Sequence, residues 1–175
     1  MAPLDRRGLL LGSATLLSMK VSAMPLSTSG VDLVEASAAS LARVMGAGRL
    51  SAEVLVQACL TRIGAVDRRG PRLNSVIERN PDALAIARTL DAERKAGRVR
   101  GPLHGSPVLL KDNIATGDRM STSAGSLALD GVRAVRDAHL VKRLREAGAG
   151  AHPIAGRDVV LQQHRQAMQG AAAHA

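Results

Sequence analysis

Apolar residues recur at helical spacing soon after residue 36, and this pattern predicts two helices in close succession. Ser37 can cap the first helix, which is expected to end at Gly46 and Gly48. Ser51 can cap the second helix. The apolar face of this second helix consists of Leu55, Cys59, Ile63 and Val66. Because only a short connection separates the two helices, we expect them to pack as a hairpin.

Two more helices are predicted further along the chain. Asn80 and Pro81 are expected to open a third helix, with the proline at its first position, and this helix runs to about Gly97. Asp91 and Lys95 lie four residues apart in it, the spacing of an exposed ion pair. A fourth helix is expected to start at Asp137, with Gly148 as its C-cap.

Two short segments between the helices are typical of strands. One is "LNSVIERN", residues 73–80, and the other is the apolar run Val108 to Leu110 that follows a Gly-rich turn. The order helix, helix, strand, helix, strand, helix predicts an α/β layer fold that is incomplete. A further strand would be expected after Gly148, but Pro153 and the glycines on either side of it leave little room for one.

The stretch "GPLHGSPVLLKDN", residues 101–113, ends its apolar run on Lys111. A charged group at the end of a buried strand needs a reason, because burying an ammonium costs free energy unless it is paired or loses its proton. The residues alone leave two interpretations open. Lys111 is either a structural ion pair or a neutral lysine that acts as a base.

Composition narrows the function classes. The chain of 175 residues has a formal net charge of +9, yet it contains no Phe, Trp or Tyr. Its core must therefore be aliphatic, and no side chain offers a base a surface for stacking, so a nucleic-acid role is disfavoured. The single cysteine, Cys59, excludes an intrachain disulfide among these residues.

Three histidines near the end of the chain are the only candidates for a metal site. These residues, His152, His164 and His174, follow no known ligand spacing and have no accompanying acidic or cysteine cluster. We therefore expect neither a metal nor a cofactor.

Residues 1–23 have the elements of a twin-arginine export signal: Arg6 and Arg7, an apolar run from Gly8 to Leu17, and a small-residue cleavage site ending at Ala23. The apolar run is too short for a stable membrane anchor. The alternative is an amphipathic surface helix. If the signal functions, residues 24–36 form a linker and the mature protein is periplasmic or secreted; otherwise the chain stays in the cytoplasm.

The sequence from about Ser37 to Ala149 resembles the amidase signature family, the serine hydrolases that cleave amide bonds. The resemblance rests on "GPLHGSPVLLKDN", "STSAGSLAL" and "RDAHLVKRLREAGA", and within the family it points to bacterial peptide amidases. It implies that residues 37–149 are the N-terminal part of a mixed sheet covered by helices. Residues 150–175 differ in composition and are interpreted as an atypical tail, for which a shifted reading frame is one explanation.

The resemblance also assigns roles. Lys111 corresponds to the family's relay base, which acts through a cis-serine on the nucleophilic serine of a carboxamide hydrolase. Gly105, Pro107, Asp112 and Asn113 would shape the turns around it. The substrate-pocket candidates are Met120, Ser121, Thr122 and Ser123.

The family's Gly- and Ser-rich segment, which carries both serines of the relay, has no counterpart in these residues. The chain is therefore expected to descend from carboxamide hydrolases, acting on small-molecule or peptide amides, and to be inactive itself. The alternatives are a non-catalytic truncated remnant and a small basic interaction protein. The sequence does not settle the oligomeric state.

Overall fold

The computed structural model of the chain describes residues 27–28, 31–32 and 35–156. The predicted export signal and the end of the tail lie outside the described residues. The helices are α1 (Ala38–Gly46), α2 (Ala52–Arg62), the π-helical η1 (Ile63–Arg69), α3 (Ala83–Lys95), the 3-10 turn η2 (Leu127–Leu129) and α4 (His139–Glu146). The strands are β1 (Ser27–Thr28), β2 (Val31–Asp32), β3 (Val76–Glu78), β4 (Pro107–Lys111) and β5 (Gly150–Gly156).

Serine caps begin α1 and α2, as the sequence predicts. The Ser37 hydroxyl accepts a hydrogen bond from the Ser40 amide at 3.2 Å, and the Ser51 hydroxyl accepts one from the Val54 amide at 3.1 Å. Each hydroxyl satisfies one of the amide groups that a helix start leaves without an intrahelical partner. The predicted ends of α1 and α3, near Gly46 and Gly97, are also confirmed.

The start of α3 differs from the prediction. The helix begins at Ala83 rather than at Pro81, because Asn80 forms a tight turn before it. The Asn80 side-chain oxygen accepts a hydrogen bond from the Asp82 amide at 2.8 Å, and its carbonyl accepts one from the Ala83 amide at 3.2 Å. Pro81 therefore belongs to the turn that leads into the helix.

Asp91 has a different partner from the one predicted. Its two carboxylate oxygens accept hydrogen bonds from the amides of Ala52 and Glu53, at 2.7 and 3.0 Å. The carboxylate of α3 thus caps the start of α2, where negative charge also favours the helix dipole. The four-residue spacing between Asp91 and Lys95 predicts a pair within one helix. It carries no information on a contact that joins two helices, as this one does.

The contact between Asp91 and the start of α2 helps to explain which helices pack together. We expected α1 and α2 to pack as a hairpin, but the main helical partner of α2 is α3. The core to which α1, α2 and α3 all contribute is aliphatic, as the absence of aromatic residues requires. Its buried members are Val44, Met45, Leu50, Ala52, Leu55, Val56, Ala83 and Ala87.

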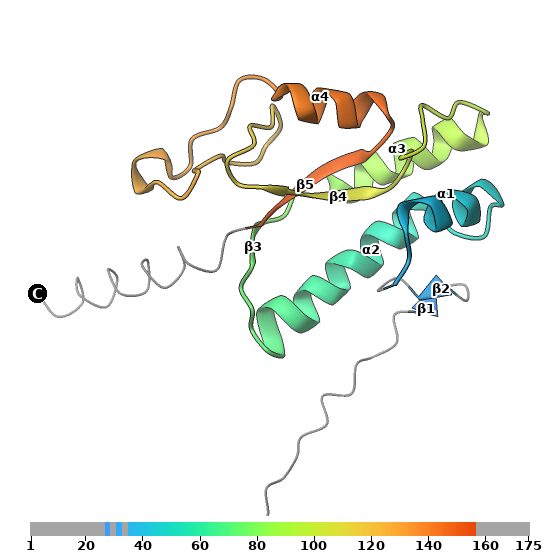
Figure 1. Cartoon of the computed structure of the whole chain (residues 1–175), viewed down its shortest axis with the longest axis horizontal. Helices are drawn as coiled ribbons and strands as arrows, with labels where there is room; N and C mark the ends of the chain where they lie inside the picture. Colours follow the sequence, from blue (N-terminus) through green and yellow to red (C-terminus); the bar gives the residue numbers. More distant parts are fainter. Residues whose placement is uncertain (1–26, 29–30, 33–34, 157–175) are drawn as a thin grey trace, which may run out of the picture.

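Strands β3, β4 and β5 form a mixed sheet in the order β3-β5-β4, and Figure 1 shows α4 above β4 and β5 with α2 below them. Strand β5 runs parallel to β4 and antiparallel to β3. The expectation that Pro153 leaves little room for a strand is therefore wrong. The register along β4 jumps from Pro107 opposite Gly150 to Leu109 opposite Ile154, so Pro153 falls in an irregular part of the ladder, where a missing N–H is tolerated.

The mixed sheet with helices confirms the predicted α/β layer class. None of the helices in the described part of the chain has the length and apolar character needed to cross a membrane.

Candidate functional site

Lys111 is the last residue of β4 and lies opposite Gly156 of β5 in the parallel ladder. Its side chain is exposed among the described residues, contrary to the expectation of a buried lysine. The reason is the position of β4 at the edge of the sheet, where one side of the strand has no further strand to cover it among the described residues. The described residues therefore leave the Lys111 side chain largely accessible to solvent.

The turn after Lys111 is closed by its own backbone and by Asp112. The Lys111 carbonyl accepts a hydrogen bond from the Ile114 amide at 2.9 Å, with Asn113 exposed in the turn. Asp112 points the other way and is buried. The strand end therefore places an exposed lysine next to a buried carboxylate.

The Asp112 carboxylate binds the loop at residues 123–125. One oxygen accepts a hydrogen bond from the Ser123 amide at 3.0 Å. The other accepts hydrogen bonds from the Ser123 hydroxyl at 2.5 Å and the Gly125 amide at 3.2 Å. Ala124 and Gly125 have φ values of 49° and 79°, which turn the amides of the loop toward one acceptor. Asp112 thus fixes the "SAG" loop beside the strand end that bears Lys111.

The four substrate-pocket candidates occupy different environments. Met120 and Ser123 are buried, while Ser121 and Thr122 are partly exposed. The Ser121 amide and hydroxyl both donate to the Glu78 carboxylate, at 2.9 and 2.7 Å, which ties the loop to β3. The Thr122 amide donates to the Val132 carbonyl at 2.9 Å. Of the four candidates, only Ser123 is hydrogen-bonded to Asp112, the residue that follows Lys111 in the sequence.

Arg145 of α4 holds the long segment between β4 and α4. Its guanidinium donates to the carboxylates of Asp137 and Asp118, at 2.8 and 3.2 Å. Asp137 also accepts a hydrogen bond from the Gly117 amide at 2.7 Å. Helix α4 begins at His139, two residues later than predicted, since the Asp137 side chain serves this network and makes no capping bond.

His104, which the sequence analysis did not single out, organises the turn before β4. Its ring accepts a hydrogen bond from the Arg100 amide at Nδ1, 3.2 Å away, so that Nε2 donates to the Leu90 carbonyl at 2.9 Å. The imidazole is buried, and both of its ring nitrogens have hydrogen-bond partners. The only sequence signal was a lone histidine between Gly-rich turns, which is also common in loops.

Gly105 explains part of the "GPLHG" pattern. Its φ is 84°, and a Cβ there would lie 2.6 Å from the Met45 methyl carbon and 2.9 Å from the Ala52 Cβ. The Gly105 amide donates to the Gly148 carbonyl at 2.8 Å. Pro107 follows as the first residue of β4. Glycine is required at this position because any side chain would collide with the start of α2.

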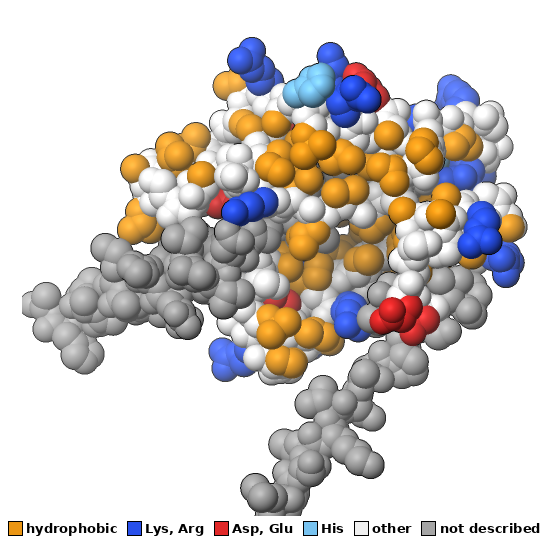
Figure 2. Space-filling model, viewed as in Figure 1, with side chains coloured by type: hydrophobic (Ala, Val, Ile, Leu, Met, Phe, Trp, Pro, Cys, Tyr) orange, Lys and Arg blue, Asp and Glu red, His pale blue; other side chains and the backbone are white. Residues whose placement is uncertain are grey.

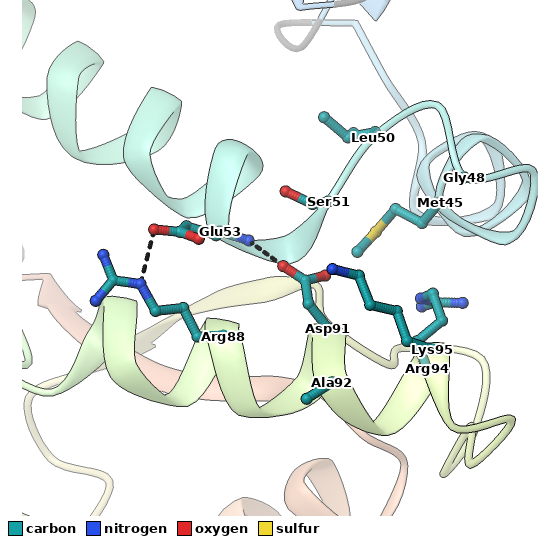
Figure 3. A pocket seen from close by; sticks show the side chains of 10 residues that line it. All are labelled: Met45, Gly48, Leu50, Ser51, Glu53, Arg88, Asp91, Ala92, Arg94 and Lys95. Carbon is teal, nitrogen blue, oxygen red and sulfur yellow. Dashed lines mark hydrogen bonds and ion pairs between the residues drawn. The ribbon is translucent and has the colours of Figure 1, made fainter.

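None of the four pocket candidates lines either of two hollows found among the described residues. The first has a volume of about 350 Å³ and lies between α3 and the connection of α1 to α2. Figure 3 shows Asp91 at its centre, bonded to the backbone of α2, with Arg88 bonded to Glu53 beside it. Because both acidic side chains already have partners, Asp91 in the amides of α2 and Glu53 in Arg88, we interpret the first hollow as a packing gap between helices.

The second hollow has a volume of about 320 Å³ and separates α2 and η1 from β4. Cys59 lines it, and burial raises the pKa of this thiol, although the charge of Arg62 opposes the shift. A thiol with a raised pKa is a weak nucleophile at neutral pH, so Cys59 is suited to packing. No group of three or more potential metal ligands occurs among the described residues.

The chain is similar in sequence to known amidases. A sequence model of the Amidase family matches residues 54–154. The chain is 46% identical over 119 residues to a putative amidase of Schizosaccharomyces pombe, covering 68% of this chain and 20% of that protein. It is 41% identical over 143 residues to a probable amidase of Arabidopsis thaliana, covering 81% of this chain and 27% of that protein.

The fold of the chain is also similar to solved amidase structures. The native peptide amidase from Stenotrophomonas maltophilia superposes with a TM-score of 0.65 and 56% identity, over 70% of this chain and 24% of that chain. The protein belongs to the amidase family. It is similar to peptide amidases, and it spans about a quarter of the length of that solved structure. The family match continues to residue 154 and so includes most of β5.

Proposed function

We propose that this chain carries the lysine-bearing portion of a carboxamide hydrolase, in which Lys111 is the proton-relay base. The observation that supports it most is the placement of Lys111 at the end of β4, within "GPLHGSPVLLKDN", on a fold portion that peptide amidases share. Peptide C-terminal amides are the proposed substrate class, by similarity to peptide amidases.

The proposed reaction is serine acyl transfer. A serine hydroxyl attacks the amide carbonyl, and its proton passes through a second serine to the neutral amine of Lys111. The relay then returns a proton to the departing nitrogen, which leaves as ammonia, and water hydrolyses the acyl-enzyme. The amine must lose its proton before it can accept one. Since Lys111 is exposed among the described residues, we propose that the serine-bearing part of the domain supplies the missing burial.

The two relay serines are not among these 175 residues, so the polypeptide by itself is proposed to hydrolyse no amide. Ser123 is not a substitute, because its hydroxyl donates to Asp112 inside the protein. The alternative function, a non-catalytic truncated remnant, is consistent with the same absence of both serines.

A chimera tests the role of Lys111. Residues 37–156 of this chain replace the matching segment of the Stenotrophomonas maltophilia peptide amidase, and release of ammonia from a peptide carboxamide is measured. We expect the chimera to be active and its Lys111→Ala variant to lose at least a thousandfold in kcat, since the relay has lost its base. Lys95→Ala, which removes an exposed lysine of α3, is the matched control. A folded Lys111→Ala chimera with unchanged kcat would refute the proposal.

We also propose that residues 1–23 direct export through the twin-arginine route. A fusion of residues 1–36 to a reporter that is active only after folded export should reach the periplasm. Replacing both Arg6 and Arg7 with lysine should retain it in the cytoplasm, whereas Lys20→Arg should not. Export that is indifferent to the arginine pair would rule out this route.

A further inference from the structure

The surface around β4 carries apolar groups that the described residues leave uncovered. Within the described chain β4 pairs with β5 only and so forms one edge of the sheet. Its central residue, Leu109, is 59% exposed. An exposed edge strand offers main-chain groups for pairing, and an exposed leucine gains free energy when it is covered.

The second hollow is lined in part by residues of this strand. Its walls include Ile63 and Val66 of η1, Val108 of β4, and two leucines, Leu73 and Leu109. Leu73 is 55% exposed, so both leucines present apolar surface at the hollow. The space of about 320 Å³ is large enough for the apolar side chains of an adjoining segment.

The distribution of side chains on this face resembles an interface. Figure 2 shows apolar side chains gathered in a band over β4, between α4 and α2, with most of the Lys, Arg, Asp and Glu side chains near the margins of the view. An apolar centre with a charged rim is the usual arrangement of a surface that another protein covers.

The comparison with the solved peptide amidase indicates what covers it. That protein shares this fold portion at a TM-score of 0.65, but the portion makes up 24% of its chain. A part of a larger layered fold carries on its surface the side chains that the rest of the fold would bury. The remaining part of an amidase domain is therefore the occupant that fits both the strand edge and the hollow.

We propose that β4 and the adjoining hollow form a docking surface for a polypeptide that carries the serine-bearing remainder of an amidase domain. The partner adds a strand to the free edge of β4 and places apolar side chains between Leu73 and Leu109. Docking would bring relay serines to Lys111 at the end of the same strand. The catalytic consequence rests on the proposed function, whereas the docking itself does not.

Co-expression tests the docking. The 175-residue chain, tagged, is produced together with the part of the Stenotrophomonas maltophilia peptide amidase that follows the matching segment. We expect a complex of one copy of each, isolated through the tag and sized by light scattering. Leu109→Glu should weaken the complex at least tenfold, because a charge would enter the interface. Val99→Glu, at a site that is 52% exposed and outside the hollow, should leave it unchanged.

The outcomes separate docking from catalysis. A complex that forms with both wild-type and Lys111→Ala chains, and hydrolyses a peptide carboxamide only with wild type, supports both proposals. A complex that depends on Leu109 but shows no turnover supports docking and contradicts the proposed function. Failure to form a complex, or a complex indifferent to Leu109→Glu, overturns the inference. So does a tagged chain that uses Leu109 to pair with a second copy or to bind anionic lipid vesicles instead.

Discussion

At the scale of single residues, the structure separates the two neighbours in "KDN". Lys111 is exposed at the strand end, whereas Asp112 is buried and accepts three hydrogen bonds from the loop at residues 123–125. The resemblance directs attention to the lysine, but the contacts show that the aspartate shapes the site in this chain. A carboxylate with only donors around it is suited to this position, because it can accept from all of them.

Asp112→Asn should therefore destabilise the protein. The amide group of asparagine would face hydrogen-bond donors, and we expect a loss of about 2 kcal/mol in the free energy of unfolding. Urea unfolding followed by circular dichroism measures it. Asn113→Asp, at the exposed neighbouring position, should change stability by less than about 0.5 kcal/mol. Equal stability of Asp112→Asn and wild type would show that the loop does not depend on this carboxylate.

Asp67 makes stability depend on pH. Burial alone would raise the pKa of this carboxyl, but hydrogen bonds from Ser75 and Val76 and the charge of Arg68 outweigh it, so the pKa lies below its usual value of 3.8. The ionised form thus stabilises the fold above that value, and the contribution is lost as pH falls through the lowered pKa. Wild type should be more stable than Asp67→Asn near pH 7, and the difference should shrink below about pH 4. A difference that grew with acidity would contradict this assignment.

At the scale of elements, sequence patterns correctly predicted features that depend on neighbouring residues, such as helix caps. They did not predict contacts between elements that are distant in sequence. The caps Ser37 and Ser51 were recognisable because capping depends on neighbours in sequence. Asp91 was misread because its partners lie on another helix, 38 and 39 residues away. Strand β5 was missed because Pro153 counts against a regular strand, and only pairing with β4 shows that the ladder is irregular there.

Removing the Asp91 carboxylate tests the contact between α2 and α3. Asp91→Ala leaves two amides at the start of α2 without their acceptor, and we expect a loss of about 1–2 kcal/mol in unfolding free energy. Asp82→Ala is the matched control at the N-cap of the same helix, since the Asp82 side chain makes no capping bond and pairs with Arg119 at the surface. Its loss should stay under about 1 kcal/mol. Similar effects of the two substitutions would mean that Asp91 is a surface charge like Asp82.

At the scale of the whole molecule, the fold class and the family could be predicted from sequence, and both are confirmed. The environment of the candidate site could not. Whether Lys111 is buried depends on which segments cover β4, and no pattern within "PVLLK" specifies them. The exposed Leu109 and the edge position of β4 became visible only once the sheet order was known. The central claim we propose is that this chain is a lysine-bearing part of an amidase fold and that residues other than these supply the relay serines.

The most direct test is the activity of the purified 175-residue polypeptide on a peptide carboxamide, followed by ammonia release. We predict no turnover above the uncatalysed rate, for wild type and for Lys111→Ala alike, because the proposed mechanism needs two relay serines that we place outside these residues. A chain confirmed as folded by circular dichroism makes that result meaningful. Turnover by the purified wild-type chain that disappears in Lys111→Ala would contradict the account, since these residues would then contain a complete catalytic site.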